Sequence, residues 1–368
     1  MAFGLTACGM FHKHSDHKSG RIVQDHGVTI VELYGSWQEM GAQYGRLAKP
    51  YLEDVLEFVD RKLTAADETA TDIADKLYFN YPDHLKDFFE AAAESSGISL
   101  DRLKLCNAVE YIEGCFCSAM AVSSEYSSDG RLIFGRNYDA TSYADIDNDV
   151  LVTVYHPDDG LAAATIGYAG EIYCVNGLNE KGIFIELNNG MPSAGWDIHW
   201  EMRPATTELF DLLFRAENLD DVDGFFGTTR SFSSFIIGVS DAKEARLYEW
   251  CYDGVKRSDG QTPDGLVAGT NHYVHPEWTF AEPTDAESWN SQTRRANILA
   301  LAEEYKGKVD VETMKAIMST PIAEGGPRHP QTRYQLVVDP GNMTIHMKLS
   351  CNDSWAGLPM YQYLSSRQ

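Results

Sequence analysis

The sequence predicts a mixed α+β fold in which two antiparallel sheets are covered by helices. Three observations lead to this prediction. The segment up to residue 112 is dominated by helical periodicity, and the segment from residue 115 breaks into short apolar runs separated by glycine-containing turns. The remaining chain then returns to helices twice, with further β-rich runs between and after them. A block order of this kind fits two sheets between helical layers.

The N-terminal part should be mostly helical after one short strand at 28–34. Ser36 and Glu39 form a capping box that opens the first helix. One apolar face follows at spacings of three and four, made by Met40, Tyr44, Leu47, Tyr51, Val55 and Phe58. We expect Pro50 to kink or split this helix. Further helices are expected at 70–80, 82–96 and 100–112.

The β-rich part begins at residue 115, and the Asp-Gly pair at 129–130 is a strong hairpin signal. It predicts that the run starting at CSAMAV turns and returns antiparallel as RLIFGRNYD. Later elements are expected as helices at 204–217, 219–226, 287–304 and 310–319, as strands at 231–239, 244–252 and 265–271, and as a closing hairpin at 334–349.

Length and charge limit the possible functions. A chain of 368 residues suits one large domain or two smaller ones. Its formal net charge of −25 makes nucleic-acid backbones and anionic membrane surfaces poor partners. No apolar run reaches the roughly 18 residues that a membrane span needs. The seven cysteines are an odd and scattered set, which does not indicate a disulfide framework.

Residues 1–25 are expected to form a flexible tail. The stretch LTAC followed by glycine resembles a lipoprotein cleavage box, which would lipidate Cys8, tether the protein to a membrane and place it in a bacterial cell envelope or periplasm. Only seven residues precede Cys8, so either the start lies upstream or the resemblance is chance, with a cytoplasmic protein as the alternative. We interpret His12, His14 and His17 as part of a solvated linker rather than as metal ligands.

The stretch EGCFCS at 113–118 is the strongest chemical signal. Its C-x-C pair lacks the partner motif that a zinc site needs, and a redox pair would have the spacing C-x-x-C before a helix. A nucleophile fits better, because the predicted hairpin returns Arg136 and Asp139 to the start of the first strand. The cation would favour a thiolate, and the carboxylate would orient an amine. A plain ion pair at a hairpin end is the competing interpretation.

Taken together, the motifs resemble a known family. The ordered set is CSAMAV, DGRLIFGRNYD, GLNEKG, LNNG, TNHYVHPE and NSQTRR, and the likeness extends from about Val28 to Leu349. It resembles the N-terminal-nucleophile (Ntn) hydrolases of the choloylglycine hydrolase and isopenicillin-N acyltransferase type. The resemblance implies a four-layer αββα sandwich over residues 117–368, preceded by a mostly helical segment at 26–116. It also implies that no metal or organic cofactor is needed.

The resemblance implies that the chain cleaves itself before a cysteine, whose free α-amine then serves as general base. Cys117 matches the nucleophile because Ser118 follows it, whereas Cys115 is followed by Phe116. Phe116 departs from the glycine that precedes the bond in many relatives. Because Gly114 supplies that glycine before Cys115, cleavage at Cys115 stays open as an alternative.

The remaining site residues also follow from the resemblance. Arg136 and Asp139 match the arginine and aspartate of the second strand, where the aspartate holds the α-amine. Asn188 and Asn271 match the asparagines of the oxyanion hole, and Arg294 matches an arginine near the nucleophile. The neighbouring residues Asn189 and Arg295 are rivals by a shift of one position, and Asn188 with Asn189 could also be a simple turn.

The function expected from this set is hydrolysis of small linear N-acyl amides through an acyl-enzyme. Acyl transfer to an amine is the alternative with the same machinery, and a non-catalytic binding lipoprotein is the alternative from another class. We interpret His272 and His275 as residues that pack against a loop or cap it, rather than as metal ligands. Three tryptophans in irregular segments could line an acyl pocket or simply pack, namely Trp196, Trp200 and Trp278.

Overall fold

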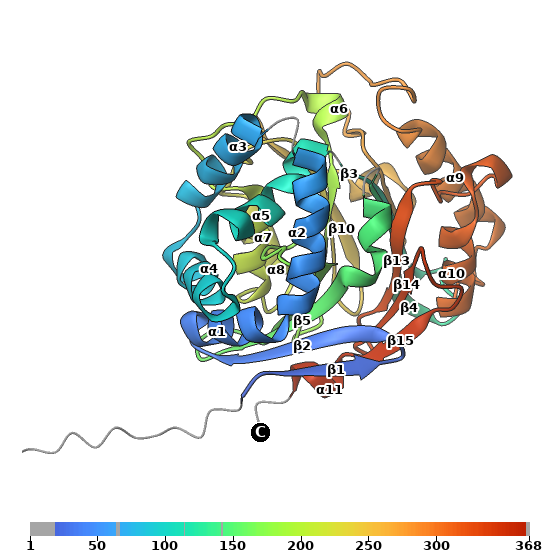
Figure 1. The fold of residues 1–368 in the computed structure, drawn as a ribbon. Helices are drawn as coiled ribbons and strands as arrows, with labels where there is room; N and C mark the ends of the chain where they lie inside the picture. Colours follow the sequence, from blue (N-terminus) through green and yellow to red (C-terminus); the bar gives the residue numbers. More distant parts are fainter. Residues whose placement is uncertain (1–18, 64–66, 114, 141–142, 366–368) are drawn as a thin grey trace, which may run out of the picture.

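The computed structural model describes residues 19–63, 67–113, 115–140 and 143–365, and it contains two stacked sheets between helices (Figure 1). The larger sheet has the strand order β1 (Arg21–Asp25), β2 (Val28–Gly35), β5 (Val150–Pro157), β6 (Ala163–Tyr168), β7 (Asn176–Asn179), β8 (Phe184–Asn189), β9 (Phe235–Ser240), β10 (Ala245–Cys251) and β11 (Gly254–Arg257). The smaller sheet has the order β12 (Leu266–Gly269), β3 (Cys115–Ser124), β4 (Gly130–Ala140), β13 (Thr332–Asp339), β14 (Thr344–Leu349) and β15 (Ala356–Pro359).

Helices cover the outer face of each sheet, as the expected αββα layering requires. The helices are α1 (Trp37–Leu47), α2 (Lys49–Leu63), α3 (Asp67–Phe79), α4 (Asp83–Ser96), α5 (Leu100–Glu113), α6 (Met191–Ala194), α7 (Ala205–Leu213), α8 (Leu219–Phe226), α9 (Ser291–Glu304), α10 (Val311–Ser319) and α11 (Tyr361–Leu364). Helices α1 and α7 contact the larger sheet, and α9 and α10 contact the smaller one. The mixed α+β prediction is therefore confirmed.

Two expectations about the larger sheet were wrong. Residues 21–25, which were assigned to the tail, form strand β1 and pair antiparallel with β2. His26 and Gly27 close this hairpin with φ values of 49° and 82°, the left-handed conformation that a two-residue turn requires. The sheet is also not purely antiparallel, because β2 and β5 run parallel. The long connection between them, which includes five helices and two strands of the other sheet, makes a parallel pair possible.

The helical segment was predicted more closely. Ser36 Oγ accepts a hydrogen bond from the Glu39 amide at 3.2 Å, which completes the expected capping box. Helix α1 ends at Leu47 and α2 begins at Lys49, so the chain divides where Pro50 was expected to split it. Gly41 lets α1 approach α4 closely, since a Cβ atom there would lie 2.2 Å from the Phe88 carbonyl oxygen.

Strand β3 places its side chains alternately on the two faces of the smaller sheet. Met120 and Val122 belong to a core cluster with α9 and α10, whereas Cys117, Ala119 and Ala121 belong to the main core that includes the larger sheet. The Cys117 side chain therefore points between the two sheets.

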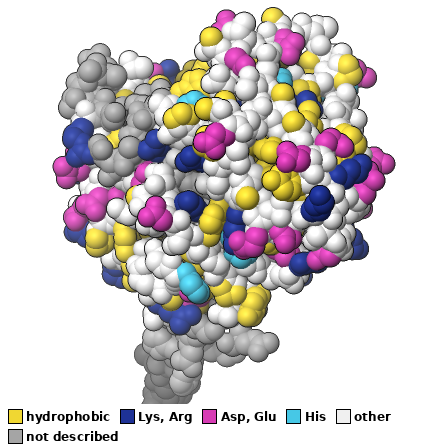
Figure 2. All heavy atoms as spheres, turned by 90° about the vertical axis from the view of Figure 1, so that its right-hand side faces the viewer, with side chains coloured by type: hydrophobic (Ala, Val, Ile, Leu, Met, Phe, Trp, Pro, Cys, Tyr) yellow, Lys and Arg dark blue, Asp and Glu magenta, His cyan; other side chains and the backbone are white. Residues whose placement is uncertain are grey.

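The surface over α9 and α10 carries acidic and basic side chains intermixed (Figure 2). On this face the excess of negative charge forms no single acidic field that would attract one kind of ligand. Among the described residues, no helix combines the length and the apolar character that crossing a membrane requires.

Candidate active site

Cys117 is the third residue of β3 and is 1% exposed. The β3–β4 register pairs Cys117 with Tyr138 and Ala119 with Arg136, so the hairpin brings the Arg136 side chain to the same face as the thiol. Arg136 Nη2 lies 3.2 Å from Cys117 Sγ. Cys115 lies two residues earlier, where its Sγ contacts Tyr138 Oη at 3.0 Å. The Arg136 contact thus lies at the Cys117 thiol, whereas the recorded contact of the Cys115 thiol is to a tyrosine hydroxyl.

Arg136 is held by the larger sheet. Its Nη1 donates to Asn188 Oδ1 at 2.8 Å and forms an ion pair with Glu186, while its Nη2 donates to the Leu187 carbonyl oxygen at 2.8 Å. Glu186 is fully buried, and burial raises its pKa to about 7 although the Arg136 cation opposes this shift. Glu186 was missed by the sequence analysis, and its signal was one charged residue inside the otherwise apolar or amide-bearing strand FIELNN.

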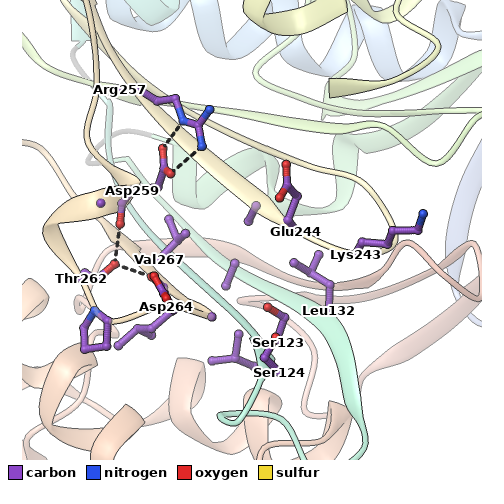
Figure 3. Close-up of a pocket in the computed structure, with 17 residues that line it drawn as sticks. Ser123, Ser124, Leu132, Lys243, Glu244, Arg257, Asp259, Thr262, Asp264 and Val267 are labelled. Atoms are coloured by element: carbon purple, nitrogen blue, oxygen red, sulfur yellow. Dashed lines mark hydrogen bonds and ion pairs between the residues drawn. The ribbon is translucent and has the colours of Figure 1, made fainter. Parts of the chain in front are cut away.

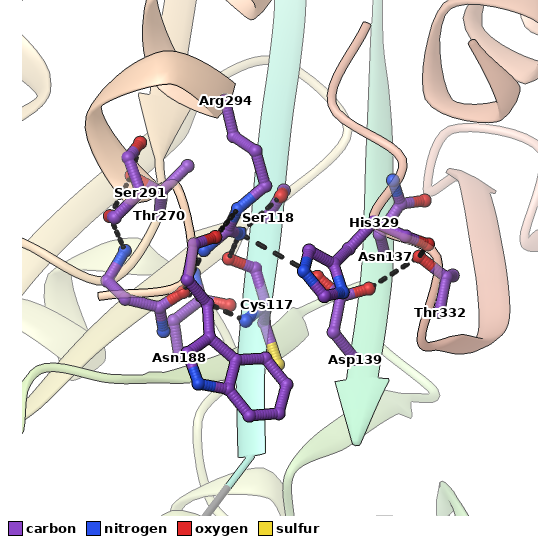
Figure 4. A network of polar contacts seen from close by, with 12 residues as sticks. Cys117, Ser118, Asn137, Asp139, Asn188, Thr270, Ser291, Arg294, His329 and Thr332 are labelled. Atoms are coloured by element: carbon purple, nitrogen blue, oxygen red, sulfur yellow. Dashed lines mark hydrogen bonds and ion pairs between the residues drawn. The ribbon is translucent and has the colours of Figure 1, made fainter. Parts of the chain in front are cut away.

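Arg294 approaches Cys117 from the opposite face of the smaller sheet. It lies in the first turn of α9, is fully buried, and donates through Nη1 to the Cys117 carbonyl oxygen and to Ser118 Oγ (Figure 4). Its Nη2 donates to Asn271 Oδ1 at 2.7 Å. Arg295, the alternative by one position, turns away and donates to the Ala268 carbonyl oxygen. The geometry thus brings Arg294, and not Arg295, to the nucleophile candidate.

Asn271 contacts Cys117 through its oxygen. The Cys117 amide donates to Asn271 Oδ1 at 3.1 Å, and Asn271 Nδ2 donates to the Asn189 carbonyl oxygen at 2.8 Å. Two donors therefore meet at Oδ1, the Cys117 amide and Arg294, which fixes the orientation of the side-chain amide. Asn188 Nδ2 is likewise engaged, because it donates to Glu186 Oε1 at 3.1 Å.

Asp139 lies opposite Phe116 in the β3–β4 register. Its Oδ1 accepts from Thr332 Oγ1 at 2.6 Å, and its Oδ2 lies 3.7 Å from Arg294 Nη1. Oδ2 has no hydrogen-bond partner within the described part of the chain, although the residue is fully buried. Burial raises the pKa of Asp139 to about 6, with Arg294 opposing the shift.

The histidines next to Asn271 are engaged in loop contacts. His272 Nδ1 lies 2.7 Å from Ser291 Oγ, and burial lowers the pKa of His272 to about 4. His275 donates its backbone N–H to Glu249 and accepts through Nδ1 from Glu277. In the four described ranges, no group of three or more His, Cys, Asp or Glu residues is arranged to hold a metal ion.

Two cavities differ in their distance from this network. A polar cavity of about 380 Å³ lies at the far end of β3, where Ser123 lines it together with the ion pair of Arg257 and Asp259 (Figure 3). Ser123 is six residues from Cys117, which corresponds to about 20 Å along a strand, so this cavity is separate from the site. A second cavity of about 300 Å³ lies beside His272 and is lined by Trp278 among other residues.

The other tryptophans differ in their positions. Trp196 is 59% exposed, and Trp200 lies under the Lys76 ammonium. Trp289, which the sequence analysis did not single out, stacks on Phe116 with 4.1 Å between ring centroids. Its signal in the sequence was its place directly before the NSQTRR motif that carries Arg294.

No protein-family model and no curated protein matches this sequence. Among solved structures, an N-acylethanolamine-hydrolyzing acid amidase ortholog from Caenorhabditis elegans is 17% identical, with a TM-score of 0.47 over 61% of this chain and 93% of that chain. A conjugated bile acid hydrolase mutant from Clostridium perfringens is 12% identical, with a TM-score of 0.47 over 67% and 93%. Penicillin V acylase from Agrobacterium tumefaciens is 11% identical, with a TM-score of 0.37 over 70% and 81%.

Proposed function

We propose that this chain is an Ntn-type cysteine amidohydrolase that cuts its own chain before Cys117 and then cleaves small linear N-acyl amides. One observation carries the proposal: three atoms of Cys117 each have a dedicated partner. Arg136 contacts the thiol, Asn271 accepts from the amide nitrogen, and Arg294 donates to the carbonyl oxygen. The amide and carbonyl contacts supply partners that any buried backbone needs, so the Arg136 contact to the thiol is the one that a space-filling cysteine would not require.

The cost of this arrangement also supports a chemical role. Arg136 and Arg294 are both fully buried, and taking a guanidinium out of water is strongly unfavourable unless it is paired. Apolar side chains of similar size would pack between the sheets without that cost. One such arginine at the thiol and a second at the backbone of the same cysteine suit a site that stabilises a thiolate and orients the groups around it.

The first reaction would be cleavage of the Phe116–Cys117 bond. Cys117 Sγ attacks the Phe116 carbonyl carbon, a thioester forms, and the C–N bond breaks as the Cys117 nitrogen takes up a proton. Water then hydrolyses the thioester, which releases a carboxylate at Phe116 and leaves a free thiol and a free α-amine at Cys117. Asn271 Oδ1 already accepts from this nitrogen before cleavage, so the new amine would form within an existing contact.

Turnover would repeat this chemistry on an external amide. The α-amine of Cys117 takes the thiol proton, and the thiolate attacks the carbonyl carbon of the substrate amide. The α-ammonium then gives its proton to the substrate nitrogen, which leaves as an amine when the C–N bond breaks. Water hydrolyses the resulting thioester. Asp139 is suited to hold the α-amine, because Oδ2 is a buried acceptor without a partner in the described chain and lies opposite Phe116. The oxyanion role of Asn188 and Asn271 stays a prediction: each Nδ2 donates one hydrogen bond, to Glu186 and to the Asn189 carbonyl oxygen respectively, and carries a second N–H.

Intact-mass measurement combined with an amide assay tests the proposal. We expect two fragments that divide between Phe116 and Cys117, and hydrolysis of N-acyl amides by the cleaved protein. Cys117→Ala should stay a single chain without turnover, and Cys115→Ala is the matched control that should still cleave and hydrolyse. A cut at Gly114–Cys115, or an uncleaved chain that hydrolyses amides, would contradict the assignment. Adding a primary amine to the assay measures acyl transfer alongside hydrolysis.

A further inference from the structure

The residue before the expected cut is held in an aromatic stack. Phe116 is 4% exposed, and its ring stacks on Trp289 with 4.1 Å between centroids and 25° between planes. Trp289 also stacks on His329, with 5.4 Å between centroids and 23° between planes. Burial and the neighbouring Arg294 lower the pKa of His329 to about 4, so this ring is neutral at ordinary pH. The stack therefore offers planar, uncharged surface.

The position of Trp289 is tied to the reacting residue. Trp289 and Asn290 both have positive φ, at 54° and 59°, which is uncommon for residues other than glycine and is maintained only where the surroundings enforce it. The Trp289 carbonyl oxygen accepts from Arg294 Nε at 3.0 Å. The same Arg294 donates to the Cys117 carbonyl oxygen, so one guanidinium fixes Trp289 relative to Cys117.

We propose that Trp289 is the wall of the acyl-binding site, and that the enzyme prefers N-acyl amides whose acyl group carries a planar ring near the β-carbon, as Phe116 does. This inference rests on the proposed function. The thioester formed during processing joins the Phe116 acyl group to Cys117 Sγ, and the thioester formed during turnover joins the substrate's acyl group to the same atom. The two acyl groups therefore start from one position, and the Phe116 ring occupies the surface that a substrate ring takes after Phe116 has been displaced.

The test compares acyl groups that differ only in planarity. The substrates are 3-phenylpropanoyl and 3-cyclohexylpropanoyl amides of one amine, and the readout is the ratio of their kcat/KM values with cleaved enzyme. Stacking adds a modest preference beyond buried area, so we expect the planar ring to be favoured by about 3- to 10-fold. Trp289→Leu should bring this ratio to about 1, whereas Trp196→Leu, which changes an exposed tryptophan outside the network, should leave it unchanged.

A second variant asks whether Phe116 leaves the stack. Phe116→Leu should slow processing, and the ratio of the two kcat/KM values should be the same in the cleaved variant as in the unsubstituted enzyme. If Trp289→Leu does not fold, Trp289→Phe serves as a variant that retains a ring. A ratio near 1 in the unsubstituted enzyme, an unchanged ratio in Trp289→Leu, or a ratio altered by Phe116→Leu would overturn the inference while leaving amide hydrolysis intact. Absence of turnover with every amide, in protein whose N-terminal Cys117 is verified by mass, would overturn the proposed function as well.

Discussion

Arg136 and Glu186 form an ion pair between the two sheets, and neither side chain has any exposure to solvent. The pair joins β4 of the smaller sheet to β8 of the larger one. Its guanidinium also contacts Cys117 Sγ, so Glu186 holds in place the cation that lies beside the thiol. A buried pair of this kind is weak support for stability, but removing one partner leaves an uncompensated charge.

The ion pair can be tested in the uncleaved Cys117→Ala background by urea unfolding. Arg136→Met should lower the free energy of unfolding by about 3 kcal/mol or more, because Glu186 is left buried without its cation. The loss should be smaller at pH 5 than at pH 8, because burial raises the pKa of Glu186 and protonation removes the charge. Adding Glu186→Gln should recover part of the loss.

The same substitutions separate stability from chemistry. In a chain that retains Cys117, the double variant Arg136→Met/Glu186→Gln should fold but should not recover turnover, because no cation remains beside the thiol. Turnover at the level of the unsubstituted protein would show that Arg136 only supports the fold.

Local patterns predicted the parts of the fold that local chemistry determines. The Ser36 capping box, the division at Pro50 and the hairpin around the Asp-Gly pair at 129–130 were all confirmed, because each depends on a few neighbouring residues. The parallel pairing of β2 with β5 could not be predicted from local patterns, because the two strands are more than a hundred residues apart in the sequence. The strand β1 was missed because its residues follow a polar tail, although the His26–Gly27 turn gave a signal.

The site likewise contains contacts that a local pattern predicts and contacts that depend on packing between distant elements. The register of one hairpin was enough to predict that Arg136 would reach Cys117. The contacts of Arg294 and Glu186 depend on how α9 and β8 pack around that hairpin, which no local pattern encodes. The role of Arg294 therefore came from the resemblance, and the only sequence signal for Glu186 was its place as a lone charged residue in the run FIELNN.

Arg294 should be sensitive to replacement by lysine. Its planar guanidinium contacts Asn271 and Trp289 as well as Cys117, and a lysine ammonium cannot reproduce that fork. Misplacing the nucleophile by a small distance is costly, so we expect Arg294→Lys to lower kcat/KM by about 100-fold. Arg295→Lys is the matched control and should change kcat/KM little. Equal losses in both variants would contradict the role assigned to Arg294.

Asp139 should make the uncleaved chain more stable in mild acid. Burial raises the pKa of Asp139 to about 6, above the ~3.9 of an exposed aspartate. Between these pH values the folded chain keeps a proton that the unfolded chain has released, so its contribution to the free energy of unfolding falls as the pH rises. This contribution is fully present at lower pH and is lost above about pH 6.

Urea unfolding of Cys117→Ala with and without Asp139→Asn measures this effect. The free energy of unfolding of Cys117→Ala, minus that of Cys117→Ala/Asp139→Asn, should fall from about pH 4 to pH 6. Above that range the difference should be constant. A difference that rises over the same range would indicate that the Arg294 cation outweighs burial and lowers the pKa of Asp139.

Substitutions of Asn271 can distinguish two roles of its side chain. In one role Oδ1 accepts a hydrogen bond from the Cys117 nitrogen, and in the other Nδ2 donates a hydrogen bond to the oxyanion. Its Oδ1 accepts from the Cys117 amide, and its Nδ2 donates to the Asn189 carbonyl oxygen. Asn271→Asp keeps the acceptor and removes the donor, whereas Asn271→Leu removes both. If the oxygen holds the Cys117 nitrogen during processing, Asn271→Asp should cleave within about 10-fold of the unsubstituted rate, and Asn271→Leu should be slower by about 100-fold. The cleaved fraction is followed over time by intact mass, and similar losses in both variants would assign the essential contact to Nδ2.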